Sequence, residues 1–152
     1  MNFHSRLPAC AMLLFAASAA AQPLPRLAAS TNDVTVSGIS SGGYMAVQFQ
    51  IAYSSIVRGA GIVAGGPYNC AEGSVRRALG SCMAPSGKDL PPTPDETLKT
   101  VRQLAESGRI DPLKHLQDDR VWLLAGGNDK TVLPPVMDAL DAHGAVPRDG
   151  LR

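Results

Sequence analysis

The chain has 152 residues, with 14 basic and 13 acidic side chains and a formal net charge of +1. A balance this close to neutral, without a polybasic run, gives no electrostatic reason to expect a nucleic acid or an anionic membrane as partner. The length is sufficient for the core of one domain.

The first 21 residues have the pattern of a secretory signal peptide. The short basic segment Met1–Arg6 precedes the apolar run Ala9–Ala20, and three alanines ending at Ala21 supply the small residues that a signal peptidase reads. The apolar run is too short to span a bilayer. Cys10 lies before the apolar core, so it does not indicate a lipoprotein. We therefore predict cleavage after Ala21, a mature part comprising 22–152, and a secreted protein, either extracellular or periplasmic.

A glycine-rich turn comes next, between a predicted strand at Val34–Ser37 and a predicted helix from Gly43 to about Tyr53. The turn, Gly38–Gly42, reads G-x-S-x-G. Between a strand and a helix, this pattern is typical of a nucleophile elbow, in which a strained turn exposes a serine hydroxyl. The alternative is an ordinary glycine-rich turn between strand and helix that has no catalytic role. The helix is expected to have Met45, Phe49 and Ala52 on its apolar face.

The position of the serine within the turn follows from its neighbours. Ser41 would need glycine at position 39, which is Ile39, so Ser40 is the candidate nucleophile. Ser41 then follows the nucleophile, and its backbone N–H is the candidate oxyanion donor. Gly38 and Gly42 are expected to lack side chains because bulk there would collide with strand and helix.

Further along the chain, strand and helix signals alternate. Thr93 and Glu96 form a predicted capping box, with Pro94 at the first helical position. The nearly all-apolar strand 121–125 is expected to be covered on both faces. The other expected segments are a buried strand at 58–64, a loop region at 68–92, a short helical turn from Asp111 and a helix at Pro134–Ala142. The alternation predicts an α/β fold with a mostly parallel sheet.

Removal of the signal peptide leaves two cysteines, Cys70 and Cys82. An even pair in an exported protein is most simply a disulfide. A disulfide that closes a loop of about a dozen residues stabilises the folded protein by roughly 3 kcal/mol. Two cysteines without a nearby histidine do not make a zinc site. We therefore predict a disulfide and no metal.

The loop Gly126–Val132, directly after the last predicted strand, contains Asp129. In α/β-hydrolases the acid of the catalytic triad follows the serine in the chain and lies in a loop at the carboxyl end of a later strand. Asp129 fits this order and would orient the catalytic histidine. Glycine, asparagine and aspartate are also ordinary turn residues, so a surface turn is the alternative.

These motifs together resemble a known family. The segments Val36–Ala46, Gly61–Cys70, Cys82–Met83 and Gly127–Val132 are similar, in this order, to the nucleophile region and following segments of secreted poly(3-hydroxybutyrate) depolymerases. The resemblance implies a serine esterase that hydrolyses polyhydroxyalkanoate esters without a cofactor, with Ser40 as nucleophile and Asp129 as triad acid. An exported feruloyl or acetyl-xylan esterase is the alternative, since it uses the same triad.

The order of the motifs also predicts an incomplete enzyme. Few residues separate the cleavage site from Val34, so the strands that precede the elbow in other α/β-hydrolases are missing there. Some depolymerases of this family resemble circular permutations of the fold, which implies a partial, permuted α/β-hydrolase fold in 22–152. His4 lies in the signal peptide, His115 precedes the acid, and His143 follows it too closely. We therefore expect an inactive N-terminal portion, truncated before the catalytic histidine; a non-catalytic remnant is the alternative.

Overall fold

The computed structural model describes residues 25, 27–31 and 33–142. The predicted signal peptide, its cleavage site, His4 and His143 lie outside the described residues.

The centre of the fold is a three-stranded sheet in which every pairing is parallel. Its strands are β1 (Val34–Ile39), β2 (Val57–Val63) and β3 (Arg120–Leu124), and they lie in the order β1-β2-β3. The helices are α1 (Ser41–Ala52), α2 (Val75–Leu79), α3 (Pro94–Glu106), the 3-10 helix η1 (Leu113–Asp118) and α4 (Pro134–Ala142). The predicted α/β class with a parallel sheet is confirmed. The predicted loop at 68–92 was wrong in one respect, because it contains α2, which begins after the capping residue Ser74.

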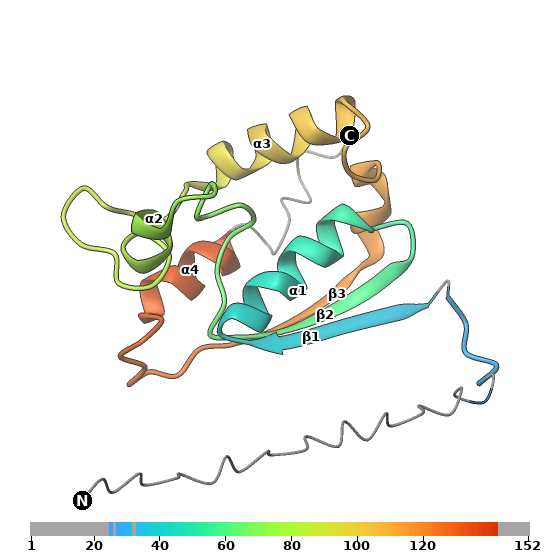
Figure 1. Ribbon diagram of the computed structural model, residues 1–152, viewed down its shortest axis with the longest axis horizontal. Helices are drawn as coiled ribbons and strands as arrows, with labels where there is room; N and C mark the ends of the chain where they lie inside the picture. Colours follow the sequence, from blue (N-terminus) through green and yellow to red (C-terminus); the bar gives the residue numbers. More distant parts are fainter. Residues whose placement is uncertain (1–24, 26, 32, 143–152) are drawn as a thin grey trace, which may run out of the picture.

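Helices α1, α3 and α4 lie on the same side of the sheet (Figure 1). The core fills the space between them and the sheet, and its fully buried members come from four of these elements: Val47, Ile51, Ile62, Val101 and Leu140. Helix α3 begins as predicted, since the Thr93 hydroxyl accepts a hydrogen bond from the Glu96 N–H and the Glu96 carboxylate accepts one from the Thr93 N–H. Among the described helices, none is long and apolar enough to cross a membrane.

The predicted apolar face of α1 is not the buried one. Met45 is 61% exposed and Phe49 is 38% exposed, whereas the buried face consists of Gly43, Ala46, Val47, Gln50 and Ile51. Apolar residues occur on nearly all sides of this helix, so periodicity alone does not select a face. The buried face includes the small residues Gly43 and Ala46, and at Gly43 the helix approaches the backbone of β2 closely.

The prediction that the last strand is covered on both faces was also wrong. In β3 the exposure alternates, and Trp122 and Leu124 remain 58% and 47% exposed. The physical reason is visible in Figure 1: the described helices cover only one side of the sheet, so every second side chain of each strand points away from them.

Candidate active site

Ser40 has the backbone conformation of a strained turn. It connects the last residue of β1 to the first residue of α1, with φ of 56° and ψ of −124°. Such a conformation costs a non-glycine residue about 1–3 kcal/mol and persists only where the surroundings enforce it. Here the Ser40 N–H donates to the Val63 carbonyl at 2.9 Å, and the Ser40 carbonyl accepts from the Tyr44 N–H at 3.0 Å. The turn is therefore held from both β2 and α1.

Two glycines make this turn possible, and only one of them was predicted. A Cβ atom on Gly38 would lie 2.2 Å from the backbone of Gly42, so Gly38 is required as expected. A Cβ atom on Gly42 would meet nothing within 4 Å, so the predicted collision there was wrong. Gly43 is the second constrained position, because a Cβ there would lie 2.9 Å from the Val63 carbonyl oxygen. The crowding arises where α1 crosses β2, which the spacing of the motif does not reveal.

The Ser40 side chain is exposed and is not used for capping. Ser40 is the N-cap residue of α1, yet its hydroxyl makes no capping hydrogen bond. The first N–H groups of a helix lack partners within the helix and carry partial positive charge. The Ser41 N–H belongs to this group, beside the Ser40 hydroxyl. The arrangement can present a hydroxyl nucleophile next to a donor for a developing oxyanion.

Asp129 lies in a tight turn after β3. Its Oδ1 accepts hydrogen bonds from the N–H groups of Thr131 at 2.8 Å and Val132 at 3.1 Å, and its own N–H donates to the Gly126 carbonyl at 3.0 Å. The side chain is half-buried, and Val132 behind it is buried. Since the local turn occupies Oδ1 alone, Oδ2 accepts no hydrogen bond from the described part of the chain.

Ser40 and Asp129 lie at the same edge of the sheet, because each follows the carboxyl end of a parallel strand. Strands β1 and β3 are separated by β2, which places their ends roughly 10 Å apart. His115, the one histidine among the described residues, belongs to η1, which precedes β3 and lies at the opposite edge. The structure thus brings the candidate nucleophile and acid to one edge and separates His115 from them.

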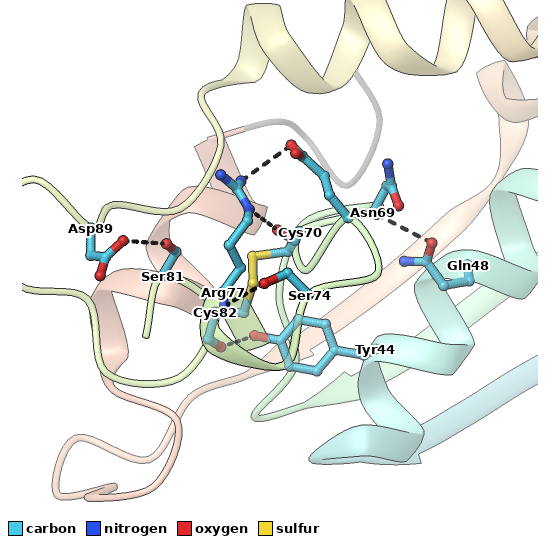
Figure 2. The surroundings of a disulfide bond; sticks show 10 residues. Tyr44, Gln48, Asn69, Cys70, Ser74, Arg77, Ser81, Cys82 and Asp89 are labelled. Atoms are coloured by element: carbon cyan, nitrogen blue, oxygen red, sulfur yellow. Dashed lines mark hydrogen bonds and ion pairs between the residues drawn. A yellow bond between two sulfur atoms is a disulfide. The ribbon is translucent and has the colours of Figure 1, made fainter. Parts of the chain in front are cut away.

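The predicted disulfide between Cys70 and Cys82 is confirmed, with Cα atoms 6.0 Å apart. Figure 2 shows that it lies beside α1: the Tyr44 hydroxyl donates to the Cys82 carbonyl, and the Gln48 side chain accepts from the Asn69 N–H at 3.2 Å. Burial raises the pKa of Tyr44 further above its usual range, so its hydroxyl stays a donor even in alkaline solution. Tyr44 was not among the predicted site residues, although its position one helical turn after Ser40 could have indicated a side chain that supports the nucleophile turn. No group of described residues has the composition of a metal site.

Comparison with known proteins agrees with this geometry. No protein-family profile matches the chain. The chain is 49% identical over 127 residues to a poly(3-hydroxybutyrate) depolymerase of Delftia acidovorans, a match that covers 82% of this chain and 25% of the relative. It is 39% identical over 132 residues to a polyhydroxybutyrate depolymerase of Talaromyces funiculosus, covering 86% of this chain and 36% of the relative.

Solved structures give the same result. A crystal structure of the PHB depolymerase from Penicillium funiculosum matches with a TM-score of 0.60 and 32% identity, over 74% of this chain and 33% of that one. A serine-to-alanine PHB depolymerase in complex with an R3HB trimer matches with a TM-score of 0.65 and 31% identity, over 80% and 36% of the two chains. Over most of its length, the chain is therefore homologous to the polyhydroxybutyrate depolymerases, of which it spans between a quarter and about a third.

Proposed function

We propose that this chain carries the nucleophile and the acid of a secreted serine esterase that hydrolyses poly(3-hydroxybutyrate)-type polyesters. The observation that carries the proposal is the strained backbone of Ser40 at the junction of β1 and α1. Strain at a non-glycine residue in an exposed turn is maintained at a cost, and such strain clusters at functional sites. The homology to depolymerases supplies the substrate class.

The proposed chemistry assigns one role to each residue. The Ser40 hydroxyl attacks the ester carbonyl carbon while a histidine accepts its proton, and the Ser41 N–H stabilises the oxyanion that forms. The alcohol end of the cleaved polymer leaves with the proton from the histidine, and water then releases the acyl group from Ser40. Asp129 orients the histidine and stabilises its charged form through Oδ2.

The base of this reaction is not among the described residues. His115 lies at the wrong edge of the sheet, and an unassisted hydroxyl is a weak nucleophile. In a triad the imidazole lies between the serine and the acid, with a hydrogen bond on each ring nitrogen. We therefore propose that the histidine enters between these two ends, from a part of the enzyme that the described residues do not include.

The export of the protein is part of the same proposal. The disulfide is typical of an oxidising compartment, and the predicted signal peptide gives the route. A polymer too large to enter a cell must also be cleaved outside it.

The decisive experiment places this chain in a complete enzyme. The matched segment of the Delftia depolymerase is replaced by the corresponding segment of this chain, and release of 3-hydroxybutyrate from the polymer is measured. We expect activity that Ser40→Ala lowers on the order of 10⁶-fold. Asp129→Asn should lower it by about 10⁴-fold, as expected when the histidine takes the wrong tautomer.

Ser41→Ala is the matched control, because it removes a neighbouring hydroxyl but keeps the backbone N–H. It should retain most of the activity. Full loss with Ser41→Ala and retention with Ser40→Ala would contradict the assignment. Residues 22–152 expressed alone should show no turnover of a p-nitrophenyl ester above background; turnover that His143→Ala abolishes would instead make His143 the base.

A further inference from the structure

We propose that Tyr44 and the segment Cys82–Met83, which a disulfide joins to Cys70, form a brace that fixes the nucleophile turn relative to the loop of the candidate acid. The two loops belong to distant parts of the sequence and follow strands that do not pair with each other. The brace contacts both loops, alongside the end of β2, where the Val63 carbonyl accepts from the Ser40 N–H and Ala64 packs with Val132. Its effect on catalysis rests on the proposed function, whereas its mechanical role does not.

The brace contacts the nucleophile turn through Tyr44. The Tyr44 N–H donates to the Ser40 carbonyl, so this residue closes the first turn of α1 directly behind the nucleophile. Its ring covers Gly66 so closely that a Cβ atom there would lie 2.4–2.7 Å from the ring and hydroxyl atoms. Its hydroxyl donates to the Cys82 carbonyl (Figure 2). The Tyr44 side chain is thus held against both the loop after β2 and Cys82.

The next residue, Met83, contacts the acid loop. Its carbonyl accepts a hydrogen bond of 2.8 Å from the Leu133 N–H. Its side chain packs, together with those of Tyr44 and Val63, against a buried cluster of Ala64, Val132 and Val136. Val132 also donates its N–H to the Asp129 carboxylate. Two consecutive carbonyls, those of Cys82 and Met83, therefore bind the elbow helix and the acid loop.

The disulfide holds this pair in place. Cys82 and Met83 lie in neither a helix nor a strand, so the hydrogen-bond ladder of a regular element does not restrain them. The bond joins Cys82 to Cys70, whose N–H donates to the Pro67 carbonyl in the loop after β2. Arg77 adds a second connection, since its Nε donates to the Cys70 carbonyl at 3.3 Å. The loops after all three strands are thereby joined at one edge of the sheet.

The proposed brace predicts that a change in the Tyr44 hydroxyl alters the exchange of a backbone amide in the acid loop, an effect that packing around Tyr44 alone does not predict. Tyr44→Phe keeps the ring and its contacts but removes the hydroxyl that reaches Cys82. If the brace exists, release of the Cys82–Met83 segment weakens the protection of the Leu133 N–H, although the substitution removes neither partner of the Leu133–Met83 hydrogen bond. A role confined to general stability would instead affect all buried amides together.

The test measures amide hydrogen exchange on the full chain by NMR, which requires no catalytic activity. We expect Tyr44→Phe to accelerate exchange at Leu133 and Val132 about tenfold, while Ile62 in the centre of β2 is unchanged. Tyr53→Phe is the matched control, because Tyr53 is an exposed tyrosine of the same helix region whose ring contacts Phe49. The control should change none of these rates. An unchanged rate at Leu133, or equal acceleration at Ile62, would overturn the brace.

A second arm tests the disulfide. Cys70→Ala with Cys82→Ala should accelerate exchange at Tyr44 and Leu133, and adding Tyr44→Phe should produce less than the sum of the separate effects, because both changes release the same segment. Strict additivity would contradict the proposal. In the Delftia chimera, Tyr44→Phe should lower kcat with KM unchanged. If the exchange results hold while Ser40→Ala leaves the chimera active, the brace stands and the proposed function fails.

Discussion

The two faces of the sheet differ sharply although the same three strands form both. On the covered face, Val36, Ala60 and Ile62 pack beneath the helices, and the core is closed. On the open face, the neighbouring residues Ile39, Trp122 and Leu124 are exposed. Parallel sheets are nearly always covered on both faces. In the described residues one helical layer covers the sheet (Figure 1), and the nucleophile turn leads directly into a helix of that layer.

The largest effect is expected where an added side chain would enter the covered side at the elbow. Gly38→Ala would place a carbon 2.2 Å from the backbone of Gly42, so strand or turn must shift. We expect a loss of at least about 4 kcal/mol in the free energy of unfolding, measured by urea denaturation.

The matched control is Gly42→Ala, whose new methyl group meets nothing within 4 Å. It should leave stability unchanged or raise it by up to about 1 kcal/mol, because alanine is the better helix former. Equal losses of stability from the two substitutions would show that crowding at the elbow does not make Gly38 more sensitive to a side chain than Gly42.

Two isoleucines, one on each face, test the difference in cover between the faces. Ile62 in β2 is 0% exposed, and Ile39 in β1 is 66% exposed. Ile62→Ala should lower the free energy of unfolding by about 2–5 kcal/mol, because it removes buried methyl groups and leaves a cavity. Ile39→Ala should lower it by less than about 1 kcal/mol, since most of that side chain is already in water. A similar loss from both would mean that the open face is covered in solution.

The smallest effect on stability is expected at Trp122, the single tryptophan of the chain and a residue of the open face. Trp122→Ser should change the free energy of unfolding by less than about 1 kcal/mol. The fluorescence of Trp122 tests whether the open face is in contact with water: iodide should quench it readily, and its emission maximum should be typical of solvated indole. Emission that shifts to shorter wavelength as the protein concentration rises would show that copies of the chain cover this face for each other.

Local features were predictable from the sequence because neighbouring residues enforce them. The capping box of Thr93 and Glu96 formed as predicted, since both partners lie within one helical turn. The strand–turn–helix context of Ser40 followed from glycines on either side of it. The pairing of Cys70 with Cys82 followed because they are the two cysteines outside the predicted signal peptide. The α/β class followed from the alternation of strand and helix signals.

The tertiary structure decided everything that depends on which surfaces meet. Nothing in the composition of α1 indicates that Ala46 is buried and Met45 exposed, because the helix is apolar on nearly all sides and only its contact with β1 and β2 selects a face. The apolar sequence of β3 predicted cover on both faces, yet cover depends on helices from elsewhere. Gly43 is required because the Val63 carbonyl lies close to it, and Tyr44 is held because its hydroxyl reaches the Cys82 carbonyl. Short-range rules cannot identify such partners, because only the folded sheet brings them together.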